Sequence, residues 1–97
     1  MIILTRPKNF KKTRFWMAIP DKDHNTVRIV RGESDMSNSI NITSQQNVEV
    51  TNAPETEARK WSKLKTNDGY EFADSKDAAT IEQLMFEERE PRNFVWF

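Results

Sequence analysis

Two stretches of sequence decide the fold of this chain: TVRIVRG at residues 26–32 and EARKWSKLKTNDGY at residues 57–70. The first alternates in the manner of a strand, with Val27, Ile29 and Arg31 on one face and the residues between them on the other. The second spaces its apolar residues by three or four positions and ends at a glycine, as an amphipathic helix does. This order predicts a small sheet followed by a helix that lies across it.

Further strands are predicted on either side of residues 26–32. Residues 13–19 are rich in apolar residues and end at a proline, and the polar turn 21–25 joins them to residues 26–31 as a hairpin. Residues 2–4 form a short strand candidate. Residues 40–43 and 48–51 alternate apolar with polar side chains around a polar centre, which predicts a second hairpin.

Two helices are predicted. The first begins near Pro54 and presents a stripe to the sheet that consists of Ala58, Trp61, Leu64 and Lys65. The second runs from about residue 76 to residue 90, with Asp74 or Ser75 as its cap and an apolar face made of Ala78, Ile81, Leu84 and Met85. The apolar tail 94–97 is expected to dock into the core or to join the sheet as an edge strand. The fold class is therefore α+β: a small antiparallel twisted sheet with one helix packed on it and a second, C-terminal helix.

The composition indicates one small domain. The chain has 97 residues, of which 36% are hydrophobic and 31% are charged, so it can bury one small core. It has no cysteine and one histidine, which leaves too few soft ligands for a structural zinc site. No apolar segment is long enough for a signal peptide or a membrane span, and the absence of cysteine suits a reducing compartment. We expect a cytoplasmic protein.

The charge is divided unevenly along the chain. Lys and Arg together balance Asp and Glu, 15 against 15. Residues 1–31 hold eight basic and two acidic residues, a net of +6, and residues 32–97 therefore carry −6. The basic third suits a nucleic acid or an acidic partner. Attraction between the two ends of the chain within the fold explains the same pattern equally well.

From residue 13 to residue 72 the chain resembles the WGR domain family. Phe15-Trp16 is similar to the aromatic pair that opens the family's first main strand, residues 27–32 to the strand that leads into its Trp-Gly-Arg tripeptide, and residues 57–70 to its helix. The chain has Arg31-Gly32-Glu33 where the family has that tripeptide, so only the glycine is kept. The resemblance implies a compact sheet with a helix on it that binds nucleic acid or docks onto protein. It divides the single domain 1–97 into a basic segment 1–12, the core 13–72, and the C-terminal helix and tail 73–97.

The leading hypothesis is a stand-alone, non-catalytic module that binds RNA or DNA. Cations beside aromatic residues suit a surface that follows a phosphate backbone and stacks bases, with Trp16 or Phe10 as the stacking face. The candidate residues are Arg6, Lys8, Lys11, Lys12, Arg14, Trp16, Arg28, Arg31, Lys60 and Lys63. The competing interpretation is that the aromatic residues are core and the lysines of the helix complement its dipole.

A second hypothesis is a protein-binding inhibitor or adaptor that acts on a nucleic-acid-processing protein, as a phage-type counter-defence or antitoxin-like factor would. Glu82, Glu87 and Glu88 of the second helix would then form the interface. A homodimer through edge strands also remains open. The sequence contains no nucleophile elbow, phosphate loop or paired catalytic carboxylates, so we expect neither enzymatic activity, nor a cofactor, nor a metal site.

Overall fold

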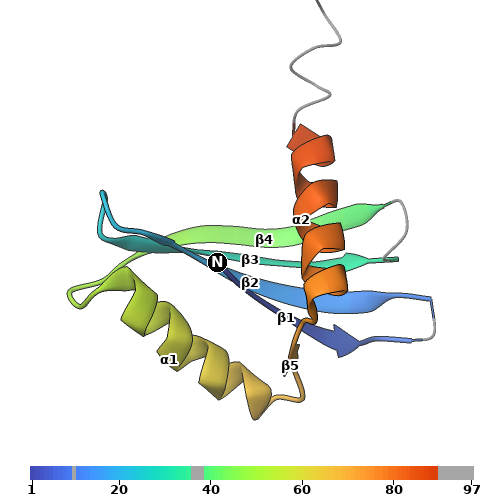
Figure 1. The fold of residues 1–97 in the computed structure, drawn as a ribbon, viewed down its shortest axis with the longest axis horizontal. Coiled ribbons are helices and arrows are strands. Elements are labelled where there is room, and N and C mark those ends of the chain that lie inside the picture. The colour runs from blue at the N-terminus through green and yellow to red at the C-terminus, as the bar shows by residue number, and fades with distance from the viewer. Residues whose placement is uncertain (10, 36–38, 90–97) are drawn as a thin grey trace, which may run out of the picture.

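The computed structural model describes residues 1–9, 11–35 and 39–89, with side chains as far as Met85. Its elements follow one another as β1 (Ile2–Pro7), β2 (Thr13–Asp21), β3 (Thr26–Ser34), β4 (Ile40–Glu49), α1 (Pro54–Thr66), β5 (Glu71–Phe72) and α2 (Ser75–Arg89). The strands form one antiparallel sheet in the order β4-β3-β2-β1-β5 (Figure 1). The predicted α+β class is confirmed.

The sheet separates two apolar clusters, because successive side chains of a strand point to opposite faces. On the face that we call the α1 face, Ala58 of α1 packs against sheet residues Leu4, Trp16, Ala18, Val27 and Ile29. On the opposite face, the α2 face, Ile81 and Met85 of α2 pack against Ile3, Phe15, Met17 and Val30. Both predicted helices therefore cover the sheet, one on each side.

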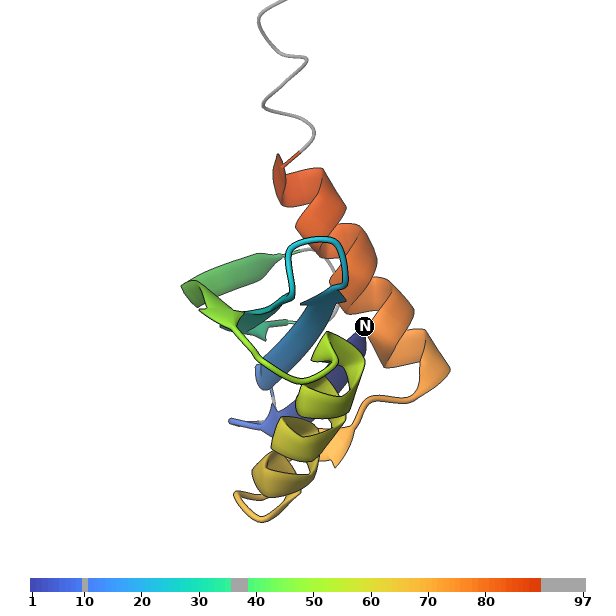
Figure 2. The ribbon, with the colours of Figure 1, turned by 90° about the vertical axis from the view of Figure 1, so that its left-hand side faces the viewer.

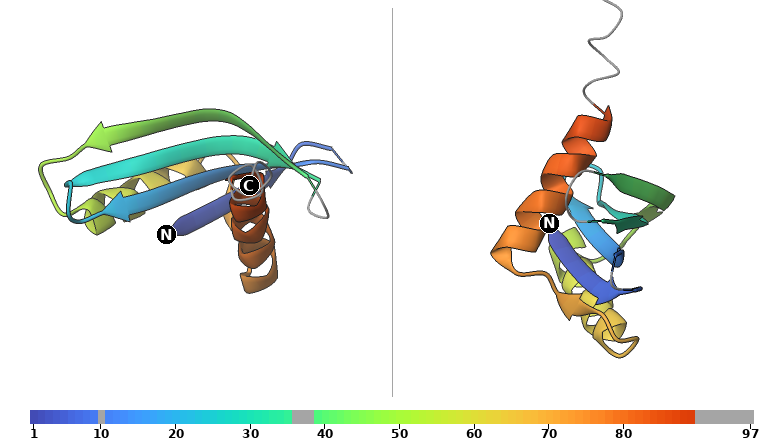
Figure 3. Two further views of the ribbon diagram at one scale, coloured as in Figure 1. Left: turned by 90° about the horizontal axis from the view of Figure 1, so that it is seen from above. Right: turned by 90° about the vertical axis from the view of Figure 1, so that its right-hand side faces the viewer.

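The two helices cover different parts of the sheet. In Figures 1 and 2, α2 runs across the strands, whereas α1 lies beside the part of the sheet near β1 and β2. The contacts of α1 fall on β1, β2 and β3. The long strands curve, as the left panel of Figure 3 shows, in keeping with the usual coiling of antiparallel sheets. The β4 side of the α1 face therefore lies beyond the main contacts of the helix.

The predicted second hairpin is wrong, because residues 40–49 form one continuous strand at the edge of the sheet. Arg31 pairs with Ser44 and Gly32 with Ile42, so Thr43 is an extra residue and forms a β-bulge. An extra residue reverses the faces that follow it. Ile40 and Ile42 accordingly pack against the α2-face cluster, whereas Val48 and Val50 pack against the α1-face cluster.

Helix α1 approaches the sheet through small residues. Ala58 and Ser62, one turn apart, are each 1% exposed, and the Ser62 hydroxyl donates to the Arg59 carbonyl at 2.7 Å. Trp61 and Lys65 are half-buried, but Leu64 is 58% exposed. The predicted stripe is thus right for Ala58 and wrong for Leu64. The small Ser62 fits against the sheet, which turns Leu64 toward solvent.

Helix α2 begins where the sequence predicts, since Asp74 Oδ1 accepts a hydrogen bond from the Asp77 backbone N–H at 2.8 Å. Its apolar face is confirmed: Ile81, Leu84 and Met85 are buried and Ala78 is half-buried. The tail 94–97, with its predicted docking, lies outside the described residues. Among the helices of the described part of the chain, none has the length and apolar character needed to cross a membrane.

Candidate nucleic-acid interface

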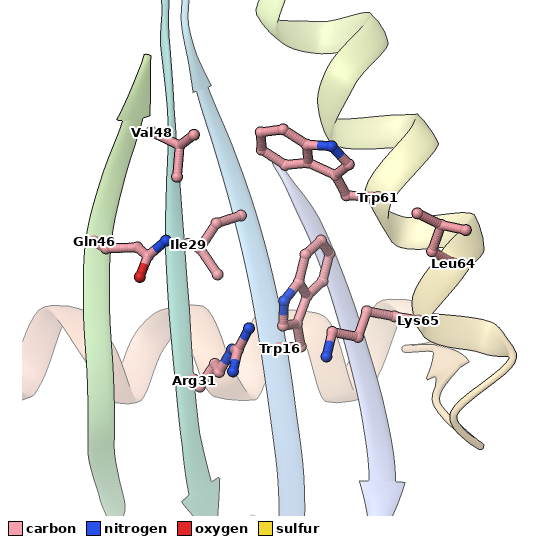
Figure 4. Close-up of a pocket in the computed structure, with 8 residues that line it drawn as sticks. All are labelled: Trp16, Ile29, Arg31, Gln46, Val48, Trp61, Leu64 and Lys65. Atoms are coloured by element: carbon pink, nitrogen blue, oxygen red, sulfur yellow. The ribbon is translucent and has the colours of Figure 1, made fainter. Parts of the chain in front are cut away.

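A groove of about 310 Å³ lies on the α1 face, between α1 and the edge strand β4 (Figure 4). It has apolar walls, one amide and two cations, and no acidic residue lines it. We call it the tryptophan groove, and its lining residues are Trp16, Ile29, Arg31, Gln46, Val48, Trp61, Leu64 and Lys65.

The groove exists because α1 covers only part of its face. Trp16, on β2, is 2% exposed and forms the floor, so the exposed stacking face predicted for this residue is absent. Trp61 is half-buried and Leu64 is largely exposed on the helix side. An aromatic ring and a leucine that are left partly in water on a concave wall are apolar surface that a ligand can cover.

Two cations flank Trp16 in the groove. Arg31 pairs directly with Trp16 across β2 and β3, and Figure 4 shows Lys65 on the other side of the same indole. The Lys65 ammonium lies 5.9 Å from the centre of the Tyr70 ring and 3.7 Å from the exposed carboxylate of Asp68. Within the described residues, the Arg31 guanidinium has no carboxylate partner. It is therefore available to an anion.

The cationic surface continues from the groove along β3. A neighbouring hollow of about 270 Å³ shares Arg31 with the groove and is also lined by Arg14, Glu33, Thr43 and Tyr70. Arg6 pairs with Arg14 across β1 and β2, and its side chain lies against Gly69 after α1. We call Arg6, Arg14, Arg31 and Lys65 the cationic end of the α1 face.

The turn between β1 and β2 adds three lysines beside this end. Asn9 Oδ1 accepts hydrogen bonds from the backbone N–H groups of Lys11 and Lys12 at 2.8 and 2.9 Å, which fixes the turn. Lys8 forms an ion pair with Glu33 of β3. The hydrogen bond from Lys8, aided by the charges of Lys12 and Arg14, lowers the pKa of Glu33 below its ordinary value of 4.5 despite partial desolvation. The basic segment 1–12 is thus held to the sheet by an ion pair between Lys8 and Glu33.

Other predicted residues lie elsewhere. Arg28 is on the α2 face, where it donates to the side chain of Gln45. Lys60 and Lys63 line a separate hollow with Thr56, Arg59 and Leu64 on the outer surface of α1. The ten predicted residues therefore fall into three groups, and the largest is at the cationic end and its turn. Phe10 lies outside the described residues.

The acidic candidates lie on α2. Glu82 is half-buried, and the side chains of Glu87 and Glu88 are outside the described part of the structure. Elsewhere, His24 Nδ1 lies 2.8 Å from Asp21 Oδ2 in the exposed β2–β3 turn, and this hydrogen bond lowers the pKa of Asp21. Among the described residues, no three His, Cys, Asp or Glu side chains gather into a metal site.

Sequence reasoning missed Gln46, Trp61 and Tyr70 as site residues. It assigned Trp61 and Lys65 to the packed stripe of the helix, and helical periodicity does place them on the correct side. Gln46 gave no signal, because its face depends on the bulge at Thr43.

Fold and groove together define the class of protein as a small α+β domain with a cationic, partly aromatic groove on one face of its sheet. No family model, no curated protein and no solved structure matches the chain.

Proposed function

We propose that this protein binds nucleic acid, RNA or DNA, on the α1 face, with single strands preferred over duplexes. One observation carries the proposal: the cationic end adjoins an open groove with Trp16 as its floor and Trp61 in its wall, and Arg31 belongs to both. Arginines and lysines neutralise phosphates, while an aromatic groove suits bases that are free to leave a stack. Membership of the WGR family, which would suit this role, remains a prediction.

The track for a bound strand follows from these positions. Phosphates at Arg14 of β2 and Arg31 of β3 would lie across these two neighbouring strands, and the β1–β2 turn would extend the contact through Lys12. A strand on this face does not reach Arg28, which lies on the other side of the sheet. The sum of such contacts gives affinity that falls steeply with salt.

The test is a fluorescence anisotropy titration of a labelled oligothymidine of about 12 nucleotides at about 50 and about 200 mM salt. Arg31→Ala should weaken binding for every sequence and reduce the salt slope by about one. Arg28→Ala is the matched control, since it removes an arginine from the same strand on the opposite face and should leave affinity and slope unchanged. Charge reversal in the turn, Lys11→Glu with Lys12→Glu, should weaken binding further.

Absence of binding, or binding that does not respond to salt, would overturn the proposal. The adaptor hypothesis would then take its place. Its test is a pull-down with the double variant Glu87→Lys and Glu88→Lys, which should abolish capture of a protein partner.

A further inference from the structure

We infer that the tryptophan groove is a base-binding subsite: it holds one unstacked base of the bound strand, and Gln46 hydrogen-bonds to the edge of that base. This inference rests on the proposed function and specifies what the groove recognises. Phosphate contacts at the cationic end alone would bind any polyanion. A base subsite adds selectivity for single strands, whose bases are free to enter the groove.

The shape and lining of the groove suit a flat aromatic ligand. Its volume of about 310 Å³ lies at the lower end of the roughly 300–1,000 Å³ range for small-ligand pockets. Ile29 and Val48 form the strand side, and Trp61 and Leu64 form the helix side. Leu64 is 58% exposed, so a base that covers it removes apolar surface from water at little cost to the fold.

Gln46 is the specific feature. It lies opposite Ile29 on β4 and lines the groove, and within the described residues its side-chain amide has no hydrogen-bond partner. An amide offers both donors and an acceptor, as the edge of a base requires. Its neighbour Gln45 points to the other face and accepts from Arg28. Gln45 therefore has a hydrogen-bond partner, whereas the next residue, Gln46, faces the open groove.

The bulge at Thr43 is what gives Gln46 this position. In a regular strand of the same length without a bulge, Ile42 and Gln46 are four residues apart and would both lie on the α2 face. The bulge therefore turns the second half of β4 toward the groove. Arg31 and Lys65 stand on either side of Trp16 at the same site, where the phosphates that flank an inserted base would lie.

The decisive experiment compares oligothymidine with an abasic oligonucleotide of equal length, about 12 nucleotides, at the same salt. The two strands carry the same phosphates. We expect oligothymidine to bind about tenfold or more tightly, because one base on an aromatic surface contributes a factor of that order. Equal affinities would overturn the base subsite and leave the proposed function standing. Failure of both strands to bind would overturn the proposed function itself.

Two variants place the effect in the groove. Leu64→Ala should weaken the binding of oligothymidine and leave the affinity for the abasic strand unchanged. Because Leu64 is exposed, this substitution should not unfold the protein, so a loss of affinity would come from the groove. Gln46→Ala should narrow the differences in affinity among oligoadenosine, oligocytidine and oligothymidine, whereas Gln45→Ala should not. If the two glutamine variants change base preference equally, Gln46 does not contact the base.

Binding can also be followed from the protein. In a Trp96→Phe background, fluorescence reports on Trp16 and Trp61, which both line the groove. Oligothymidine should quench this emission and the abasic strand should not. Quenching of the same size by both strands would show that the signal comes from phosphate contacts, and would contradict the subsite.

Discussion

Gly32 lies inside β3 at a position where its neighbours leave no room for a side chain. A Cβ atom there would lie 2.3 Å from the Asn41 carbonyl oxygen and 2.7 Å from Cζ of Phe15. The strand continues through Gly32 to Ser34, and the missing Cβ lets the backbone of Asn41 on β4 approach closely.

Gly32→Ala should therefore destabilise the protein by about 1–3 kcal/mol, the usual cost of overpacking a well-filled site. The loss appears as a lower urea midpoint with an unchanged slope. Adding Phe15→Leu should recover little, because it relieves the ring contact but leaves the carbonyl oxygen in place and removes buried surface. Ser44→Ala, an exposed change on the adjacent strand, is the control and should be close to neutral. A Gly32→Ala protein as stable as the parent would refute the packing argument.

Glu33 is a carboxylate set among cations. Its folded pKa lies below the ordinary 4.5, first because of the hydrogen bond from Lys8. As the pH falls, the unfolded chain takes up this proton before the folded one does. The stabilisation from the pair is thus complete above pH 4.5 and is lost as the pH falls through the lowered pKa of the folded state.

Glu33→Gln should consequently lower the urea midpoint at neutral pH, and its deficit against the parent should close as the pH falls below 4.5. Lys8→Gln should give the same pattern. The double variant should lose little more than either single one, since each change removes the same pair. A deficit that stays constant across the acid range would mean that the ion pair is not its cause.

At the scale of elements, local signals predicted the two helices well. Pro54 marks the start of α1, and the side chain of Asp74 caps α2. The polar run 44–47 led to the wrong prediction of a turn, because its composition is typical of a turn. These residues lie on an edge strand, where polar side chains on exposed positions are ordinary. The bulge reverses the alternation in mid-strand, and no single-residue signal in the sequence marks it.

Deletion of Thr43 tests the role of the bulge. Deletion leaves Ile42 opposite Gly32 and Ser44 opposite Arg31, so Ile40 and Ile42 keep one cluster and Val48 and Val50 keep the other. We expect a small loss of about 0.5–1.5 kcal/mol in urea unfolding, because the shortened strand is regular and loses only the contacts of Thr43. Thr43→Ala keeps the residue count and removes one hydrogen bond of 3.2 Å to the Arg31 carbonyl, so it should cost only about 0.5–1.5 kcal/mol. A deletion that costs much more than the substitution, or that abolishes folding, would show that the sheet needs the bulge itself.

At the scale of the whole molecule, both faces of the sheet carry a buried apolar cluster, and the proposed binding surface lies on the α1 face alone. Part of the basic N-terminal third gathers at one end of the sheet, since Arg6 and Arg14 pair across β1 and β2. The groove could not be predicted, because it depends on how far α1 extends over the sheet. Arg28 and Arg31 differ by three residues and fall on opposite faces, so strand alternation already separates them.

This division predicts that the two faces respond differently to mutation. Ile81 is fully buried on the α2 face, and Ile81→Ala should cost about 2–5 kcal/mol in urea unfolding. It should nevertheless leave the affinity for oligothymidine unchanged at temperatures where the variant remains folded, because the groove lies across the sheet. Leu64→Ala should do the reverse, with stability nearly unchanged and affinity reduced. Loss of affinity in a folded Ile81→Ala protein would place the binding surface on α2 or couple the two faces, and either result would contradict a site confined to the α1 face.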